Sequence, residues 1–221
     1  MEPRGKPGRG PRRGYGKGPP SRSGEPRPPS RSGRPRPPER SSEERLSRFL
    51  AFILRHHPEQ VRLSLDEQGY VDVDALIEAV RTRPGFETVG RQHIEELLAS
   101  EPASQRFEVA GNRIRARYGH TLPQTIQYEP AEPPEFLFHG TTPENAGQIL
   151  ADGLKPIERQ RVHLSVDTPA AREVGRRRCP EPVILRIDTV CATKGGAKFY
   201  CGGPSVWLSD EIPPQCIVRL E

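Results

Sequence analysis

Residues 136–143, which read F-L-F-H-G-T-T-P, decide the fold of the second half of the chain. The three apolar residues 136–138 predict a short buried strand. Thr142 is suited to cap a helix, Pro143 to open it and Gly153 to end it. The strand therefore meets a helix N-terminus at His139, a natural place to hold a phosphate or a ribose. A simple strand-ending turn explains the same residues equally well.

Short strands dominate the sequence downstream of this stretch. Val162 and Leu164 lie on one face of an expected strand and His163 on the other, and Thr168 opens a second helix that runs to about residue 177. Because strands outnumber helices, this region is expected to be α+β and not doubly wound. The expected strands are 136–138, 161–165, 183–187, 198–200, 205–208 and 216–220.

Helices dominate upstream. Residues 41–44 read S-S-E-E, a capping box, and the helix that follows is expected to stop at Pro58, with Arg55 and His56 in its last turn. Asp72 caps a second helix, and a third contains Ile94. A hairpin over residues 106–117 follows, with Arg106 on its polar face. Three short helices and a terminal hairpin resemble a winged-helix lobe.

Composition divides the chain into four parts. Residues 1–40 hold 12 Lys or Arg, 3 Asp or Glu, 11 Pro and 8 Gly, which gives a net charge of +9. This segment cannot bury enough surface to offset the entropy of ordering it, so we expect a disordered basic tail rich in Arg, Gly and Pro. Residues 41–120 form the winged-helix-like lobe, residues 121–135 a proline-rich linker, and residues 136–221 the second lobe.

Several classes of protein are disfavoured. No apolar run reaches the length of a membrane helix and no apolar segment follows the basic N-terminus, so neither membrane insertion nor secretion is expected. The four cysteines form no C-x-x-C pair, so we expect reduced thiols, no disulfide framework and a cytoplasmic protein. No metal-ligand cluster and no Gly-rich phosphate loop is present.

Basic residues occupy positions that structure alone does not demand. Arg55 and His56 end a helix, where cations also simply complement the helix dipole. Arg106 on the polar face of a strand is equally explained by solvation. Arg159 and His163 flank the start of a strand, and ordinary surface exposure would account for either of them.

Taken together and in order, these blocks resemble the RNA 2'-phosphotransferase family. The enzymes of this family use NAD to remove the 2'-phosphate that RNA ligation leaves at a splice junction, as in tRNA splicing. The resemblance runs from about residue 46 to residue 220 and does not cover the tail. The blocks are L-R-H-H-P (54–58), Q-R-F (105–107), R-I-R-A-R-Y-G-H-T (113–121), F-H-G-T (138–141), R-Q-R-V-H-L-S (159–165) and S-V-W-L (205–208).

The resemblance implies an ADP-ribosyltransferase-like second lobe that binds NAD. By that resemblance His139 contacts the adenosine ribose, the nicotinamide ring stacks on His163, and Val206 stands where many protein-modifying relatives have a glutamate. A phosphate dianion is already nucleophilic and would be repelled by that carboxylate. Gly140, Thr141 and Ser165 complete the implied NAD-binding set.

The resemblance also implies a catalytic set of Arg55, His56, Arg106 and Arg159. Guanidinium groups hold phosphate oxygens in pairs and keep their charge, and His56 is the member able to move a proton near neutral pH. In the implied reaction the RNA 2'-phosphate attacks the nicotinamide ribose, which releases nicotinamide and leaves an ADP-ribosylated RNA phosphate. Transesterification by the ribose 2''-hydroxyl then gives 2'-hydroxyl RNA and ADP-ribose 1'',2''-cyclic phosphate. NAD is consumed, no metal is needed, and a monomer acting on tRNA-like RNA is expected.

Two blocks depart from the family pattern. The family usually shows A-N-Q-G-H-S where residues 116–121 read A-R-Y-G-H-T, and N-G-V where residues 203–206 read G-P-S-V. Two other functions are kept open. One is an ADP-ribosyltransferase that modifies terminal phosphates of nucleic acid or protein, and the other is a non-catalytic winged-helix protein that binds RNA.

Overall fold

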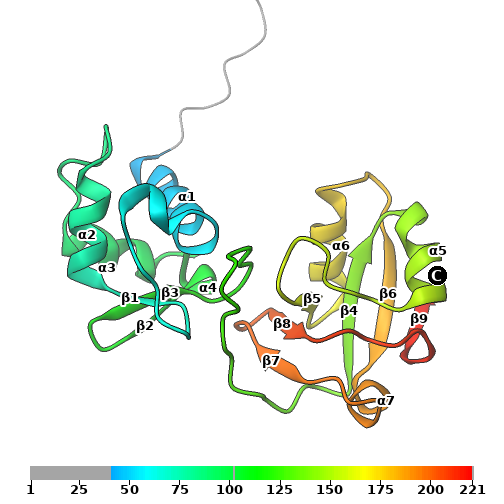
Figure 1. Cartoon of the computed structure of the whole chain (residues 1–221). Coiled ribbons are helices and arrows are strands. Elements are labelled where there is room, and N and C mark those ends of the chain that lie inside the picture. Colours follow the sequence, from blue (N-terminus) through cyan, green and yellow to red (C-terminus); the bar gives the residue numbers. More distant parts are fainter. Residues whose placement is uncertain (1–40, 102, 221) are drawn as a thin grey trace, which may run out of the picture. The chain divides into compact units, whose positions relative to one another are not determined.

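The structure is a computed structural model that describes residues 41–101 and 103–220 (Figure 1). The predicted disordered tail, residues 1–40, lies outside the described residues. Within the described residues the chain forms seven α-helices and two antiparallel sheets, which confirms the predicted α+β class. None of the helices among them is long and apolar enough to cross a membrane.

The first sheet has three antiparallel strands in the order β1-β3-β2. Strands β2 and β3 form the predicted hairpin, in which Val109 pairs with Ile114, and β1 pairs with the other edge of β3. The elements of this region are α1 (Ser42–Arg55), η1 (Pro58–Val61), β1 (Tyr70–Asp72), α2 (Val73–Arg81), α3 (Arg91–Ala99), α4 (Ala103–Arg106), β2 (Phe107–Ala110) and β3 (Arg113–Ala116).

Side-chain caps fix the starts of α1 and α2, as the sequence predicts. The Ser41 hydroxyl accepts a hydrogen bond of 3.1 Å from the backbone N–H of Glu44. The Asp72 carboxylate accepts two hydrogen bonds from backbone N–H groups in the first turn of α2. Such caps satisfy N–H groups that have no partner inside the helix. Helix α1 begins at Ser42 and ends at Arg55, so this arginine lies in its last turn.

The second sheet has six antiparallel strands in the order β7-β8-β5-β4-β6-β9 (Figure 1). Strands β4 and β5 lie at its centre, so the residues of F-H-G-T and V-H-L-S are neighbours. The elements are β4 (Phe136–Thr141), α5 (Pro143–Asp152), β5 (Val162–Ser165), α6 (Thr168–Arg176), β6 (Val183–Asp188), α7 (Thr189–Lys194), β7 (Phe199–Cys201), β8 (Val206–Ser209), η2 (Pro214–Cys216) and β9 (Ile217–Leu220).

Glycines allow α6 to pack directly on β4. A Cβ atom on Gly140 would stand 1.9 Å from the carbonyl oxygen of Ala171, and one on Gly175 would stand 2.4 Å from Cβ of Pro182. Neither position therefore tolerates a side chain. Gly140 is required in β4 because the backbone of α6 passes over it, and this holds one face of the central strands in place.

The described residues form two hydrophobic cores. The first joins α1, α2 and α3 to the small sheet, and the second joins the six-stranded sheet to α5 and α7. The boundaries predicted at residues 120 and 135, and the likeness of the two lobes to winged-helix and ADP-ribosyltransferase folds, stay predictions. Fully buried members of the first core include Leu50, Leu54, Leu76, Leu97 and Ile114, and those of the second include Leu137, Leu185, Ile187 and Ala192.

The prediction for Arg106 is wrong in one respect. Arg106 ends the short helix α4 and precedes β2, so it does not lie on the polar face of a strand. Its side chain turns toward α1, where Nη1 donates a hydrogen bond of 3.1 Å to Ser47 Oγ. Four residues are too few for a recognisable helical pattern, and the tertiary contact with α1 decides the conformation.

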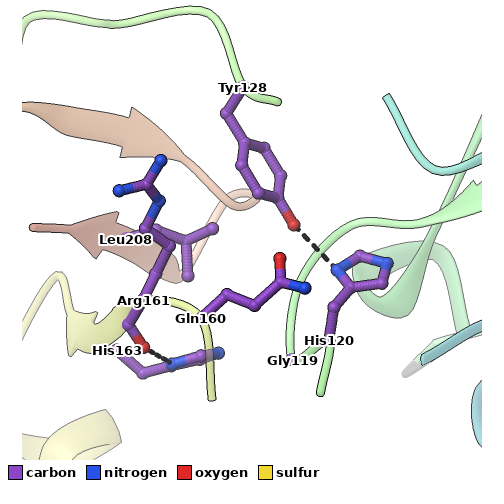
Figure 2. Close-up of a pocket in the computed structure, with 7 residues that line it drawn as sticks. All are labelled: Gly119, His120, Tyr128, Gln160, Arg161, His163 and Leu208. Carbon is purple, nitrogen blue, oxygen red and sulfur yellow. Dashed lines mark hydrogen bonds between the residues drawn. The ribbon is translucent and has the colours of Figure 1, made fainter. Parts of the chain in front are cut away.

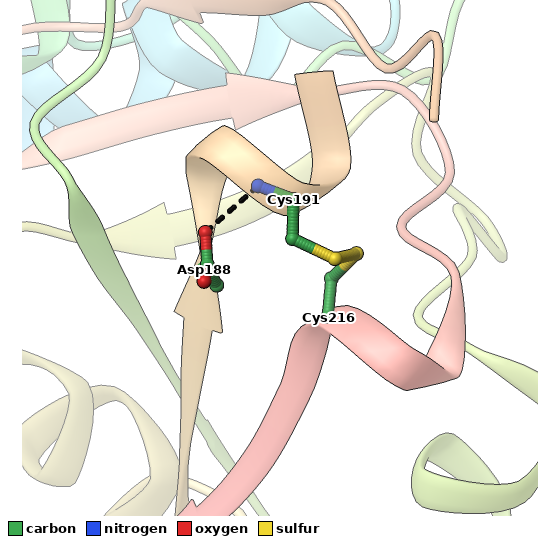
Figure 3. The surroundings of a disulfide bond; sticks show 3 residues. All are labelled: Asp188, Cys191 and Cys216. Carbon is green, nitrogen blue, oxygen red and sulfur yellow. Dashed lines mark hydrogen bonds between the residues drawn. A yellow bond between two sulfur atoms is a disulfide. The ribbon is translucent and has the colours of Figure 1, made fainter. Parts of the chain in front are cut away.

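The expectation that all cysteines are reduced is also wrong for one pair. Cys191 in α7 and Cys216 at the end of η2 form a disulfide, with their Cα atoms 5.5 Å apart (Figure 3). Asp188 caps α7 by accepting a hydrogen bond from the N–H of Cys191. Spacing alone could not identify the pair, because the two cysteines meet only when α7 packs on η2. Cys179 and Cys201 are free thiols.

Candidate active site

Arg55 ends α1 with its guanidinium in a confined position. Its Nε and Nη2 atoms are buried and have no hydrogen-bond partner among the residues that the structure describes. The guanidinium carbon lies 4.9 Å from the centre of the Tyr118 ring, and Gly119 passes so close that a Cβ atom there would contact the Arg55 side chain at 3.5 Å. Burial lowers the pKa of Arg55. Two donor nitrogens, which carry three N–H groups, are therefore held beside an aromatic ring and remain available to a ligand.

Two of the predicted arginines, Arg106 and Arg159, act electrostatically on the third, Arg55. After burial and the opposing effect of Tyr118, the charges of Arg106 and Arg159 lower the pKa of Arg55 further. Within the described residues, none of the three has a carboxylate at ion-pair distance. Neighbouring cations repel one another, and an anion such as a phosphate would relieve that repulsion.

His56 follows Arg55 and is tied to the segment after β3. Its Nδ1 atom is hydrogen-bonded to Thr121 Oγ1 over 2.8 Å, and the Thr121 N–H donates to the Arg55 carbonyl oxygen over 3.0 Å. Burial, followed by the charge of Arg55, lowers the pKa of His56. A neutral imidazole at physiological pH is able to accept a proton, which fits the role that the sequence predicts.

Arg159 is held in place by the residue after it. The Gln160 side-chain amide donates to the carbonyl oxygens of Leu122 and Gln124 over 2.8 and 2.7 Å, and its Oε1 accepts from the N–H of Ile126 over 2.9 Å. These three hydrogen bonds fasten the loop before β5 to the segment that follows the small sheet. Burial and then the charge of Arg178 lower the pKa of Arg159.

The predicted NAD-binding residues meet on β4, β5 and β8. Ser165 pairs with Val206 across β5 and β8, and His163 pairs with Leu208 two residues along. His139 on β4 donates an Nδ1–H hydrogen bond of 3.0 Å to the carbonyl oxygen of His163. The sheet therefore brings together residues that are almost 70 positions apart in the sequence.

His163 is neutral over the physiological pH range. Burial, followed by the charge of Arg159, lowers its pKa to about 3. Its Nδ1–H donates to the Arg161 carbonyl oxygen over 3.0 Å (Figure 2). This leaves Nε2 as the acceptor, and it is buried with no partner in the described part of the chain. The Tyr118 and His163 rings form an edge-to-face contact, with the two ring centres 5.8 Å apart and their planes at 72°.

A small pocket adjoins His163. It measures about 10 Å³, room for one water-sized group, and it is lined by His120, Tyr128 and Gln160 among others (Figure 2). His120 Nδ1 is hydrogen-bonded to the Tyr128 hydroxyl over 2.9 Å. Burial lowers the pKa of His120 to about 4 and raises that of Tyr128 to about 12, so both side chains are neutral.

The other predicted residues have less direct roles. Gly140 is explained by its packing against α6, and Thr141 and Ser165 are buried, so their contacts with NAD stay predictions. Among the described residues, no group of three His, Cys, Asp or Glu side chains is arranged to hold a metal ion.

Sequence reasoning missed Gln160 and Tyr128 and treated Tyr118 only as a departure from a family pattern. A glutamine between Arg159 and Arg161 gives no sign that its amide will bind backbone three times. The ring of Tyr118 is significant because it contacts both Arg55 and His163. These contacts depend on tertiary structure, which no local pattern encodes.

Comparison with known proteins assigns the chain to a family. The model of the family described as "RNA 2'-phosphotransferase, Tpt1 / KptA family" matches residues 41–211. A protein of Thermococcus kodakarensis named "Probable RNA 2'-phosphotransferase" is 41% identical over 174 residues, which cover 79% of this chain and 95% of the relative. A protein of the same name from Bacillus thuringiensis is 40% identical over 172 residues, covering 78% of this chain and 92% of the relative. The chain therefore belongs to the RNA 2'-phosphotransferase family.

Proposed function

We propose that this protein removes an internal 2'-phosphate from tRNA-like RNA by transferring it to NAD. Family membership supports the reaction class. The observation that carries the proposal for this chain is the arrangement around Tyr118, which contacts both Arg55, with its unpaired donors, and the neutral ring of His163. The Tyr118 ring thus contacts both Arg55, which is suited to bind an anion, and His163, which is suited to stack on an aromatic cation.

In this proposal the arginines bind the 2'-phosphate. Arg55 offers two buried donor nitrogens, and Arg106 and Arg159 add charge, with none of the described carboxylates at ion-pair distance from either. Phosphoryl transfer depends on positioning and on offsetting the charge that develops on the phosphate oxygens. A cluster of fixed cations serves both needs.

His56 is proposed to move the proton in the second step. A hydroxyl that attacks phosphorus must lose its proton, and the lowered pKa of His56 keeps the imidazole unprotonated near neutral pH. The hydrogen bond to Thr121 orients its ring. The first step needs no strong base, since the phosphate is already an anion and nicotinamide leaves as a neutral molecule.

The NAD-binding residues are proposed to be His139, Gly140, Thr141, His163, Ser165 and Val206. The nicotinamide ring of NAD carries a positive charge, so a neutral imidazole can stack on it where a protonated one would repel it. The pKa of His163, lowered to about 3, fits that requirement, and its partnerless Nε2 leaves a hydrogen-bond acceptor for a ligand. Val206 adds no carboxylate to repel the phosphate.

The fold is part of the proposal. We assign residues 41–120 to a winged-helix-like lobe that binds RNA and residues 136–221 to an ADP-ribosyltransferase-like lobe that binds NAD, with residues 121–135 as the linker. The first assignment is supported by the three-stranded sheet with its helices, and the second by the six-stranded sheet that carries both histidines.

Nicotinamide release tests the proposal. The protein is incubated with NAD and an oligoribonucleotide that carries one internal 2'-phosphate, and in parallel with the same oligonucleotide carrying a 2'-hydroxyl or a 5'-phosphate. We expect release only with the 2'-phosphate. Release with the 5'-phosphate and a stable ADP-ribosyl product would identify a terminal-phosphate ADP-ribosyltransferase. Binding of RNA without any release would identify a non-catalytic RNA-binding protein.

A further inference from the structure

Tyr118 lies where the two departures from the family pattern meet. A Cβ atom on Gly202 would stand 3.4 Å from Cδ1 of the Tyr118 ring and 3.3 Å from a side-chain carbon of Val206. One on Gly203 would stand 3.5 Å from Cδ of Arg117. The aromatic residue in A-R-Y-G-H-T is thus packed against the glycine turn that precedes G-P-S-V. The two blocks that depart from the family pattern are therefore packed against each other, through residues 117–118 and 202–203.

The face of the Tyr118 ring contacts the Arg55 guanidinium, and Tyr118, followed by Tyr128, offsets part of its charge. The guanidinium carbon lies 4.9 Å from the ring centre, and none of the described carboxylates lies at ion-pair distance. A carboxylate in its place would cancel the charge and occupy the N–H donors. An aromatic face attracts the cation through its quadrupole and uses no donor.

The same ring also contacts His163, in the other half of the site. Tyr118 and His163 are in edge contact at 5.8 Å, with planes at 72°. The segment that carries Tyr118 is also fastened at Thr121, which bonds to both Arg55 and His56. The ring therefore has a fixed position between the guanidinium and the imidazole.

We propose that Tyr118 is a positioning residue that presents the guanidinium of Arg55 to the 2'-phosphate with its donors unpaired. This inference rests on the proposed function. Tyr118 does not itself touch the reacting atoms. It supplies, through its ring face, the support that a buried cation needs when the anionic ligand is absent.

The nature of the support makes the inference specific. Among the described residues the Tyr118 hydroxyl has no hydrogen-bond partner. A phenylalanine at this position should therefore support Arg55 as well as the tyrosine does. A branched aliphatic side chain would fill part of the space and lose the quadrupole. Met offers a second non-aromatic replacement, because its flexible thioether adapts to irregular space.

The test compares dissociation constants for two oligoribonucleotides that differ only in an internal 2'-phosphate or 2'-hydroxyl, measured without NAD. The wild-type protein should prefer the 2'-phosphate, and Tyr118→Phe should keep most of that preference. Tyr118→Leu and Tyr118→Met should lower it about tenfold. Phe136→Leu is the matched control. The guanidinium carbon of Arg186 lies 4.6 Å from the centre of the Phe136 ring, so this substitution deletes a cation–π contact outside the site.

The outcomes separate the inference from the proposed function. If the wild-type protein shows no preference for the 2'-phosphate, the proposed function fails. If the wild-type preference is present and both Tyr118→Leu and Tyr118→Met retain it, the positioning role is overturned. A Tyr118→Phe variant that loses as much preference as Tyr118→Leu would overturn it too. Thermal unfolding of each variant identifies any loss that comes from misfolding.

Discussion

The Nδ1–H of His139 on β4 donates a hydrogen bond of 3.0 Å to the backbone carbonyl oxygen of His163 on β5. This bond defines which nitrogen of His139 carries the proton, and the bond from His163 Nδ1 to the Arg161 carbonyl oxygen does the same for the second ring. Both Nε2 atoms are then acceptors. Two neutral imidazoles with a defined orientation are better suited to bind an aromatic cation than a phosphate. Their proposed role therefore differs from that of Arg55, Arg106 and Arg159, which are proposed to bind the phosphate.

This difference predicts a division of labour between His163 and Arg106. His163→Ala should weaken NAD binding about tenfold or more, whereas Arg106→Ala should weaken binding of the 2'-phosphorylated oligonucleotide by a similar factor, because a charge-assisted hydrogen bond is lost. Calorimetry with NAD and fluorescence anisotropy with RNA measure the two affinities. Arg48→Ala, which removes an exposed arginine paired with Glu44, is the control for charge. Loss of NAD binding in Arg106→Ala, together with unchanged binding in His163→Ala, would contradict the assignment.

A second prediction concerns the rates of the two chemical steps. His56→Ala should slow the second step more than the first, because only the second step requires a hydroxyl to lose its proton. ADP-ribosylated RNA should then accumulate and migrate more slowly than the substrate on a denaturing gel. We expect at least a tenfold fall in the rate of conversion of this species. An equal slowing of both steps, with no accumulation, would restrict His56 to phosphate binding.

The buried histidines predict a loss of stability in acid. The pKa of His120 is about 4 in the folded protein against an ordinary value of 6.5, so the unfolded chain takes up the proton first as the pH falls. The contribution of neutral His120 to the free energy of unfolding is fully present above pH 6.5 and is lost as the pH falls from 6.5 to about 4. His120 should contribute on the order of 2–3 kcal/mol of this loss.

Urea unfolding at pH 7.5 and pH 4.5 measures this effect. In His120→Gln the difference between the two pH values should shrink, since the group that titrates is gone. His57→Gln, which alters a histidine paired with Glu59 at the surface, serves as the control. The explanation fails if His120→Gln loses as much stability on acidification as the wild-type protein.

The disulfide predicts a redox-dependent stability of the second core. Cys191 and Cys216 are 25 positions apart, and closing a loop of that length in the unfolded chain stabilises the folded state by about 3 kcal/mol. Cys191→Ser/Cys216→Ser should lose that amount and become insensitive to dithiothreitol. Cys179→Ser should behave as the wild-type protein. Mass spectrometry of a non-reduced digest that finds both thiols free would contradict the bond.

Local sequence patterns predicted the elements that have local causes. The caps at Ser41, Asp72 and Thr142 and the hairpin of β2 and β3 follow from neighbouring residues, and all four are present. Helix α4 and the disulfide did not follow, because each depends on packing between distant segments. Arg106 was recognised through its block, yet its helical conformation comes from the contact with α1.

The site was predicted as a set of residues but not as an arrangement. The blocks identified Arg55, Arg159 and His163, and nothing in their spacing indicated that one tyrosine would connect them. Tyr118 acquires its role from the ring contacts that folding creates. Gln160 likewise acquires its role from three backbone groups that lie 34 to 38 residues away in the sequence.

The fate of the phosphorus atom tests the central claim most directly. An oligoribonucleotide with a single radiolabelled internal 2'-phosphate is incubated with the protein and NAD, and the products are separated by chromatography. The account predicts that the label moves into ADP-ribose 1'',2''-cyclic phosphate in an amount equal to the nicotinamide released, and that the RNA is left with a 2'-hydroxyl. Label that stays on the RNA, or that appears as inorganic phosphate without NAD consumption, would contradict it.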